Sequence, residues 1–290
     1  MKIIKVRLRE VIFYTILLSL SLNAYATPKE DLMKFRKYFK QKFPDIKFQD
    51  FGNGVYALDK SRREIWEGME DFAPAYTDAV ELGKKLFYID FPNGKNYSSC
   101  FKNGGIGIKH LYPYFSKATG KVKTLEKEIN QCRIKNNLKP LKYKKGHLAA
   151  ISAFMASTSR GKPINVKVPS DKRALKVYNT GKHHFYAKRG QLNFSCADCH
   201  MYNAGMNVRA DLLSPALGQV SNYPVWRLKW AVGKNNPTAG LGTLHRRYAG
   251  CNKNIRSKPF KAQSDQYVGL EYFHSYMNNG IKLNGPAIRQ

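Results

Sequence analysis

A five-residue segment, Cys196-Ala197-Asp198-Cys199-His200, constrains this chain more than any other feature of its sequence. Cys-x-x-Cys-His is the attachment sequence of c-type haem, in which both cysteines form thioethers and the histidine reaches the iron. A zinc site would need a second Cys-x-x-Cys, which the sequence lacks. A thioredoxin-like pair would follow a strand, not the helix and loop expected here. The motif predicts one haem c on Cys196 and Cys199, with His200 as an axial iron ligand.

The first 26 residues have the pattern of a secretory signal peptide. A cationic start precedes an apolar stretch at 11–22 and Ala24-Tyr25-Ala26, an A-x-A cleavage site. The stretch is short for a transmembrane helix, which needs about 20 residues, and an uncleaved anchor is the alternative. No second apolar segment of spanning length follows. We therefore expect a mature chain in the periplasm, where disulfides persist, with no membrane segment after cleavage.

The rest of the chain has the pattern of a duplication, because residues recur at one constant offset. Pairs of identical residues are each separated by 119 positions, so their alignment needs no gap. The pairs are Thr124-Leu125 and Thr243-Leu244, Cys132 and Cys251, Lys139-Pro140 and Lys258-Pro259, Phe154 and Phe273, Gly161 and Gly280, and Asn165 and Asn284. Gly83-Lys84 also resembles Gly181-Lys182. We therefore expect two related domains, which join near residues 161–172.

The predicted fold is mainly α, with two tandem class I cytochrome c-like domains. After the signal peptide at 1–26, residues 27–165 form the first domain and 166–290 the haem-binding one. The segment Ser98-Ser99-Cys100-Phe101-Lys102 stands where the first domain would carry a haem motif. The first domain is therefore predicted to bind no haem.

Local patterns place the principal elements of each half. Apolar residues at helical spacing precede Gly161, which is predicted to be the C′ glycine of a helix. Ser264 is a predicted N-cap of the corresponding helix, which ends at Gly280. Residues 64–87 favour a helix broken near Pro74, and residues 164–168 are the strongest strand candidate.

The cysteine count adds a second constraint, because five is an odd number. The haem motif takes two of the cysteines, and the third cysteine of the second half is Cys251. In a first half without haem, the two remaining cysteines are free to form a Cys100–Cys132 disulfide. Such a bond would cross-link the emptied pocket and leave Cys251 unpaired.

Cys251 lies in a strongly basic setting, with Arg246, Arg247, Lys253 and Arg256 within five residues on either side. Such cations lower the pKa of a thiol and favour the thiolate, which is both a nucleophile and an iron ligand. A buried free cysteine beside a solvated basic loop is the plainer interpretation. The rival candidates for the distal iron ligand are Met201, Met206, His245 and Met277, of which Met277 is the strongest.

The charge balance narrows the class of partner. The chain has 50 Lys and Arg against 20 Asp and Glu, a formal net charge of +30. A surface this basic attracts nucleic acid, acidic proteins, anionic lipid or small oxyanions. No nucleic-acid recognition motif is present, and an exported haem protein has no evident use for nucleic acid. Acidic proteins, anionic lipid and small oxyanions stay open as partners.

Together these features resemble the SoxA family, the cytochrome c subunits of bacterial SoxAX complexes of thiosulfate oxidation. The resemblance covers nearly the whole mature chain and rests on the haem motif and five further segments. These are Arg209-Ala210-x-x-Leu213-Ser214-Pro215-x-Leu217-Gly218, Tyr223-Pro224-Val225-x-Arg227, Arg246-Arg247-Tyr248-x-Gly250-Cys251-Asn252, Ser264-Asp265-x-Tyr267-x-x-Leu270-Glu271 and Gly285-Pro286.

The resemblance implies an L-cysteine S-thiosulfotransferase, which joins thiosulfate oxidatively to a cysteine of the carrier SoxYZ and passes electrons to its partner SoxX. It implies that Cys251 is the catalytic cysteine and an axial iron ligand, commonly as a persulfide. Arg247 matches the substrate-holding arginine, and we expect Arg246 and Lys253 to assist it. The missing first-domain motif indicates the single-haem type, for which a Cys100–Cys132 disulfide is also implied.

The alternative from another class is a non-enzymatic periplasmic electron-transfer cytochrome c. In that case Cys251 or Met277 would only ligate the iron. Turnover separates the two hypotheses, because a simple electron carrier does not conjugate thiosulfate to a protein thiol.

Overall fold

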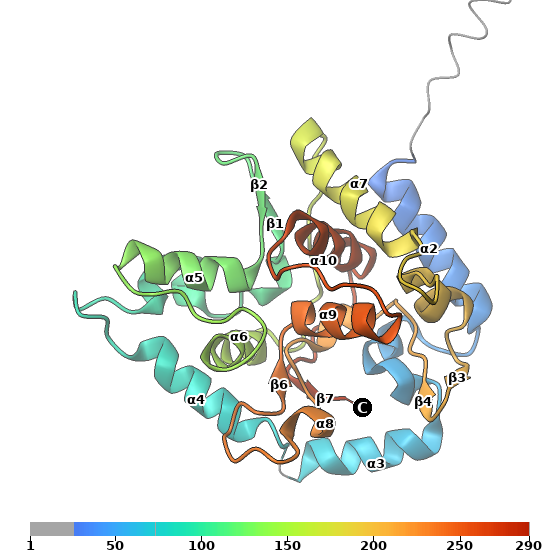
Figure 1. Cartoon of the computed structure of the whole chain (residues 1–290), viewed down its shortest axis with the longest axis horizontal. Coiled ribbons are helices and arrows are strands. Elements are labelled where there is room, and N and C mark those ends of the chain that lie inside the picture. Colours follow the sequence, from blue (N-terminus) through green and yellow to red (C-terminus); the bar gives the residue numbers. More distant parts are fainter. Residues whose placement is uncertain (1–25, 73, 290) are drawn as a thin grey trace, which may run out of the picture.

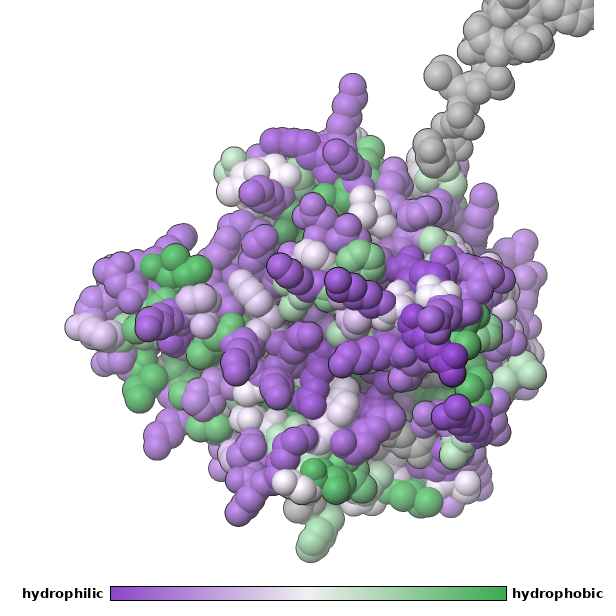
Figure 2. All heavy atoms as spheres, in the orientation of Figure 1, coloured by the Kyte–Doolittle hydropathy of each residue, from purple (hydrophilic) through white to green (hydrophobic). Residues whose placement is uncertain are grey.

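The computed structural model describes residues 26–72 and 74–289, which form a mainly helical structure with a few short strands (Figure 1). The mainly α prediction is therefore confirmed. The predicted signal peptide, apart from Ala26, lies outside the described residues. Within the described ranges, no helix is both long and apolar enough to cross a membrane. Hydrophilic side chains cover most of the face shown in Figure 2, with hydrophobic patches toward its edges.

The N-terminal segment packs on the second half of the chain rather than on the first. Helix α2 (Pro28–Lys42) begins at a capping box, in which Glu30 N–H donates to the Thr27 hydroxyl and Thr27 N–H donates to the Glu30 carboxylate. Its buried Phe35 and Phe39 belong to the same apolar core as Tyr178 and Phe273. The 3₁₀ segment η1 (Phe48–Ala57) and helix α3 (Lys60–Asp71) follow.

The first half is built around three helices. These are α4 (Thr77–Tyr88), α5 (Leu125–Lys135) and α6 (His147–Ser157). Between them lie η2 (Tyr97–Cys100), η3 (Lys102–Gly105), η4 (Lys109–Leu111) and an antiparallel hairpin of β1 (Tyr114–Ser116) and β2 (Lys121–Lys123), in which Tyr114 pairs with Lys123. The predicted break near Pro74 is confirmed, because it falls between α3 and α4.

The second half has α7 (Lys172–Tyr186), η5 (Asp198–Tyr202), α9 (Leu244–Asn254) and α10 (Asp265–Met277) as its main elements. The short elements are β3 (Asn207–Val208), β4 (Asp211–Leu212), η6 (Gln219–Asn222), β5 (Val225–Trp226), α8 (Leu228–Ala231), β6 (Leu241–Gly242) and β7 (Ala287–Ile288). Strands β3 and β4 pair with each other, and β5 lies between antiparallel β6 and parallel β7.

Each half contains one pair of helices whose backbones touch at a glycine. Helix α4 packs on α6 and α7 packs on α10. A β carbon on Gly83 would lie 2.0 Å from the Ala150 carbonyl oxygen, and one on Gly181 would lie 1.9 Å from the Gly269 carbonyl oxygen. Any larger residue would force these helices apart, so glycine sets both crossings.

A buried polar contact also occupies corresponding positions in the two halves. Ser152 on α6 donates to the Glu126 carboxylate on α5 at 2.7 Å. The corresponding helices of the second half, α9 and α10, are in contact where His245 Nε2 lies 3.0 Å from the Glu271 carboxylate. Both pairs differ by 119 positions, and so do the two ends of α5 and α9.

The predicted strand at residues 164–168 is wrong. The segment is extended and Ile164 N–H donates to the Ile281 carbonyl at 2.9 Å, but only Pro163 forms a bridge there, with Lys282. The Asn279 side chain instead bonds both the N–H and the carbonyl of Val166. A side chain therefore takes the place of a partner strand.

The ends of the two predicted helices also differ from expectation. Ser264 caps α10 as predicted, since its hydroxyl accepts from Tyr267 N–H. However, α6 and α10 have their C-caps at Thr158 and Asn278, so neither Gly161 nor Gly280 is the C′ residue. Both glycines have positive φ values, 79° and 85°, in the turns that follow.

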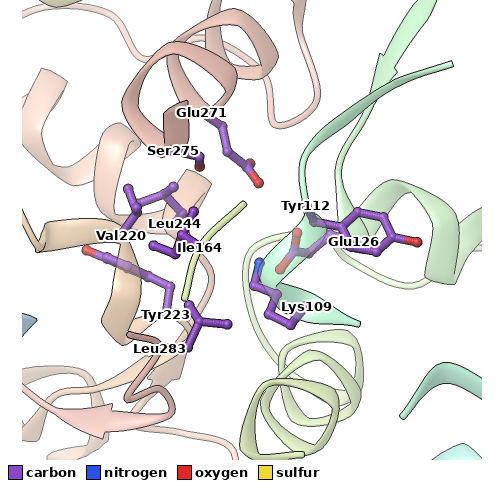
Figure 3. A pocket seen from close by; sticks show the side chains of 10 residues that line it. All are labelled: Lys109, Tyr112, Glu126, Ile164, Val220, Tyr223, Leu244, Glu271, Ser275 and Leu283. Atoms are coloured by element: carbon purple, nitrogen blue, oxygen red, sulfur yellow. The ribbon is translucent and has the colours of Figure 1, made fainter. Parts of the chain in front are cut away.

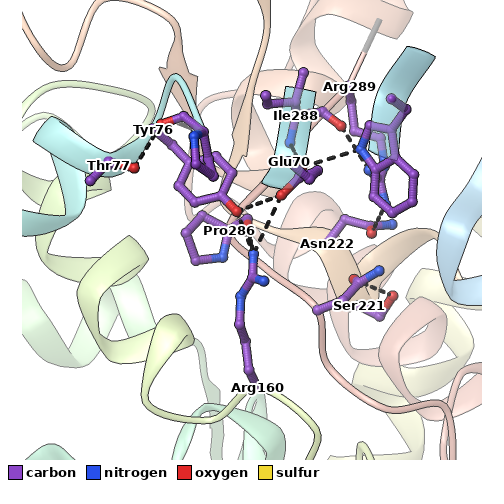
Figure 4. A network of polar contacts seen from close by, with 12 residues as sticks. Glu70, Tyr76, Thr77, Arg160, Ser221, Asn222, Pro286, Ile288 and Arg289 are labelled. Carbon is purple, nitrogen blue, oxygen red and sulfur yellow. Dashed lines mark hydrogen bonds and ion pairs between the residues drawn. The ribbon is translucent and has the colours of Figure 1, made fainter. Parts of the chain in front are cut away.

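Polar contacts connect the two halves and the C-terminal segment. A cavity of about 20 Å³, enough for about one water molecule, is lined by Lys109 and Glu126 from one half and by Glu271 and Ser275 from the other (Figure 3). In a second network, the Glu70 carboxylate accepts from Ile288 N–H and from the Tyr76 hydroxyl (Figure 4). These contacts tie α3 to β7 at the end of the chain.

Candidate functional site

The haem-motif cysteines lie on one capped helical turn. The Ser195 hydroxyl accepts from Asp198 N–H at 3.0 Å, and the Asp198 carboxylate accepts from Ser195 N–H at 2.8 Å. This reciprocal pair starts the helical segment that carries Cys196 and Cys199 three residues apart, both half-buried. The two thiols are therefore presented on adjacent positions of one turn, as thioether attachment requires.

A backbone carbonyl fixes the orientation of His200. The Nδ1 atom of its ring lies 2.9 Å from the carbonyl oxygen of Ser214 and 2.9 Å from the Gln219 side-chain amide. Since a carbonyl can only accept a hydrogen bond, Nδ1 carries the proton and Nε2 keeps its lone pair. The free Nε2 is the atom that an iron ligand must offer.

Cys251 lies on α9, far from His200 in the sequence, and the fold brings the two residues into one site. Both His200 and Arg247, the latter one helical turn before Cys251, act on the Cys251 thiol. Burial raises the pKa of the Cys251 thiol, but Arg247, His200 and Arg227 outweigh it and lower the pKa to about 6. A lowered pKa is the direction of shift that the basic setting of Cys251 predicts. In turn the Cys251 charge raises the pKa of Arg247.

The thiols of the haem motif ionise differently. Burial, together with the negative charge on Cys251, raises the pKa of Cys196 to about 12. Burial likewise raises the pKa of Cys199. Among these three cysteines, Cys251 alone has the character of a thiolate near neutral pH.

Two basic residues expected to assist Arg247 lie elsewhere. Arg246 stacks on the Trp230 ring at 4.0 Å and donates to the Leu241 carbonyl at 2.6 Å. Lys253 is exposed. The reason is helical geometry, because residues four apart share a face whereas Arg246 and Lys253 are five before and two after Cys251.

Sequence reasoning missed two residues of this site, Arg227 and Tyr223. Arg227 follows β5 and is only 4% exposed. Burial, together with the charge of Arg247, lowers its pKa to about 10. Burial raises the pKa of Tyr223 to about 12, whereas Arg247 opposes that rise. Both residues stand in the segment Tyr223-Pro224-Val225-x-Arg227, but nothing in its spacing connects it to Cys251.

The rival candidates for the iron ligand lie in environments different from that of Cys251. His245 faces Glu271 and Met206 is 59% exposed. Met201 accepts from the Tyr186 hydroxyl at 3.6 Å, and Met277 is fully buried in the apolar core. Cys251, by contrast, is near enough to His200 for the imidazole to lower its pKa.

These residues fit a covalently attached haem. The site combines two adjacent thiols, an imidazole nitrogen with a free lone pair and a thiolate, which is the donor set of a thiolate-ligated c-type haem. The core around it is apolar, as a macrocycle requires, and includes Phe185, Met201, Ala204, Leu217 and Tyr248.

Comparisons with known proteins agree with this chemistry. The family model described as SoxA/TsdA, cytochrome c domain, matches residues 83–164, in the half that carries the disulfide and lacks the haem motif. The chain is 50% identical over 268 residues to the L-cysteine S-thiosulfotransferase subunit SoxA of Chlorobaculum tepidum, covering 92% of this chain and 90% of the relative.

Two further comparisons extend the match. The corresponding subunit of Allochromatium vinosum is 44% identical over 266 residues, covering 91% of each chain. A crystal structure of SoxXA from P. pantotrophus aligns with a TM-score of 0.70 at 28% identity, covering 81% of this chain and 86% of that one.

Proposed function

The chain belongs to the SoxA family and is an L-cysteine S-thiosulfotransferase subunit, and from this premise we propose its reaction and partners. It joins thiosulfate oxidatively to a cysteine of a SoxYZ-type carrier and passes electrons to a SoxX-type cytochrome c. The observation that carries the proposal is the lowered pKa of Cys251, which comes from its neighbours Arg247 and His200. The structural neighbour is a SoxXA complex, which supports a SoxX-type partner for this chain.

The overall reaction forms one sulfur–sulfur bond. The terminal sulfur of thiosulfate bonds to the carrier's cysteine sulfur, the carrier thiol loses its proton, and two electrons leave to the partner cytochrome. Arg247 holds the sulfonate oxygens by charge-assisted hydrogen bonds. Cys251 contributes the sulfur nearest the reacting atoms and is ionised at neutral pH, since its pKa is about 6.

One haem c completes the site in this proposal. Cys196 and Cys199 would hold it by thioethers, and His200 and Cys251, the latter as its thiolate or persulfide, would ligate the iron. When bound, the haem supplies a one-electron redox centre beside Cys251. A pyridine haemochrome assay on exported protein is expected to return one haem per chain; two haems, or none after maturation, would refute the assignment.

The finer architecture is two tandem class I cytochrome c-like domains, the first without haem. Supporting this are the glycine-centred crossings of α4 with α6 and α7 with α10, and the matching polar contacts at Glu126–Ser152 and His245–Glu271. The Cys100–Cys132 disulfide, with Cα atoms 5.7 Å apart, lies in the first domain. We place the protein in the periplasm on the strength of the signal peptide pattern and this disulfide.

Turnover with the intact complex tests the proposal. The protein, its cytochrome partner and a carrier with one reactive cysteine are mixed with thiosulfate, and the carrier's mass is measured. We expect a mass increase of one thiosulfate-derived group, together with cytochrome reduction. Cytochrome reduction without any carrier adduct would instead support the non-enzymatic electron-transfer alternative, which the names of the relatives do not favour.

A further inference from the structure

Two buried polar side chains of the second half, Tyr248 on α9 and His274 on α10, have no part in the reaction proposed above. They are only 7% and 3% exposed. The Tyr248 hydroxyl lies 3.3 Å from His274 Nδ1, and His274 Nε2 lies 3.1 Å from the carbonyl oxygen of Ala216. Because a carbonyl can only accept, Nε2 carries the proton and Nδ1 accepts from the hydroxyl. This Tyr248–His274 relay therefore connects α9 to the backbone at Ala216.

The protonation state that the relay needs follows from its surroundings. Burial lowers the pKa of His274 to about 4, although the bond to the Ala216 carbonyl opposes the shift. The ring is therefore neutral at neutral pH, with one donor and one acceptor nitrogen. Both nitrogens are used, so the relay is fully satisfied inside the core.

The relay ends on the segment that orients His200. Ala216 N–H donates to the His200 carbonyl at 2.8 Å, and the Ser214 carbonyl accepts from His200 Nδ1 at 2.9 Å. This short segment thus holds both the backbone and the ring of His200. The Asn278 side chain also anchors it, since it accepts from Gly218 N–H and donates to the Ala216 carbonyl at 3.3 Å.

The first half shows that this fold does not need the relay. At the offset of 119 residues, Tyr248 corresponds to Ile129 and His274 to Met155. Both of these apolar residues are fully buried in the core of the first half. Two buried polar side chains therefore replace two apolar ones in the half that carries the haem motif.

The anchor at Asn278, by contrast, has a counterpart in the first half. The same offset places Ser159 at this position, and its hydroxyl accepts from Lys109 N–H at 3.0 Å. Asn278 likewise accepts from a backbone N–H, that of Gly218. A side-chain anchor after the helix is thus common to both halves, whereas the relay belongs to the second alone.

We propose that Tyr248 and His274 are positioning residues for His200, which hold the Ser214 carbonyl in place against His200 Nδ1. The inference rests on the proposed function only for the role of His200 as an iron ligand. A histidine whose second nitrogen donates a well-aligned hydrogen bond is a more basic ligand, which favours the oxidised state of the metal it binds. The relay therefore keeps the midpoint potential low.

The midpoint potential of the haem-loaded protein, measured by spectroelectrochemical titration, tests this role. Tyr248→Phe removes only the hydroxyl, and His274→Met introduces the residue that the first half has at this position. We expect covalent haem in both variants and a more positive potential, with the larger shift in His274→Met, which loses the bond to Ala216. The double variant should shift no further than His274→Met, because residues of one network are not additive.

A rescue variant and a control separate positioning from ordinary stabilisation. His274→Gln keeps a side-chain N–H for the Ala216 carbonyl, so we expect it to retain most of the wild-type potential. Tyr272→Phe removes another fully buried hydroxyl of α10, which donates to the Lys167 carbonyl at 2.6 Å. This control should lower the free energy of unfolding in urea and leave the potential unchanged.

The double variant keeps the test available if a single variant does not fold. His274→Met strands the Tyr248 hydroxyl, whereas Tyr248→Phe with His274→Met makes both positions apolar, as they are in the first half. Three results would overturn the proposal: a wild-type potential in the double variant, an equal shift in Tyr272→Phe, or a double variant that does not fold, which would assign the relay to the fold.

The inference and the proposed function fail in different ways. An unshifted potential in the relay variants, with normal formation of the thiosulfate adduct by the wild type, would refute the positioning role alone. A shifted potential in those variants, with no adduct formed by the wild type, would refute the proposed function alone.

Discussion

At the scale of single residues, the sulfur site contains thiols that share a pocket but not an ionisation state. Burial raises the pKa of Cys196 to about 12, whereas Arg247 and His200 overcome burial at Cys251 and lower its pKa to about 6. The sequence predicts this difference in part, because Arg247 is one helical turn from Cys251. It does not predict Arg227, which is 24 positions away and reaches the site through β5. Local spacing identifies contacts along a helix, but not contacts made by folding.

His184 provides a residue-scale prediction on pH. A histidine in an unfolded chain has a pKa of about 6.5. Burial, and then the charge of Arg189, lowers the pKa of His184 to about 3. Between these values the unfolded chain binds a proton that the folded chain does not, so stability falls on acidification by up to about 1.4 kcal/mol per pH unit.

The variant His184→Gln removes this titration. Its free energy of unfolding in urea is expected to fall less steeply than that of the wild type as pH drops through the ordinary histidine range. Identical slopes for the two proteins would contradict the assignment.

At the scale of elements, helix crossings depend on positions where no side chain fits. The recurring Gly-Lys pairs at 83 and 181 are visible in the sequence, but the reason for the glycines appears only when α4 meets α6 and α7 meets α10. The helix start at Ser264 is predictable because an N-cap is a local feature. The strand expected at 164–168 fails because the Asn279 side chain, over a hundred positions away, bonds to Val166.

Gly181→Ala tests the crossing directly. The new methyl group would meet the Gly269 carbonyl oxygen at 1.9 Å, so we expect a loss of about 1 to 3 kcal/mol or more in unfolding free energy. Gly68→Ala is the control, because Gly68 lies in α3 with no atom within 4 Å of the added carbon. That variant should gain about 0.5 to 1 kcal/mol from helix propensity. Equal effects in both variants, measured by chemical denaturation, would argue against the close approach.

At the scale of the whole molecule, two cores share one chain and an N-terminal segment. The offset of 119 residues locates two similar halves in the sequence, but it says nothing about residues that precede the repeat. Helix α2 packs on the core of the second half, because Phe35 and Phe39 belong to that core. The domain bounds predicted from the sequence place this helix in the first domain. The disulfide was predictable from the cysteine count together with the duplication, because the haem motif takes two cysteines and the offset places Cys251 in the second half.

The disulfide is expected to stabilise the first half without touching the sulfur site. Replacing Cys100 and Cys132 by serine opens a loop with a sequence separation of 32. The chain-entropy model gives a loss of about 3 to 4 kcal/mol. We expect a lower unfolding free energy and an unchanged haem spectrum; a changed spectrum would show that the two halves are coupled at the site.

The most direct test of the account is turnover by Cys251→Ala in the intact complex. Haem attachment depends on Cys196 and Cys199, so the variant should still carry one haem by the pyridine haemochrome assay. Because the thiolate beside Arg247 is lost, we expect no thiosulfate-dependent adduct on the carrier cysteine above background, measured by intact mass. A variant that conjugates thiosulfate to the carrier at the wild-type rate would contradict the assignment of Cys251 as the catalytic residue.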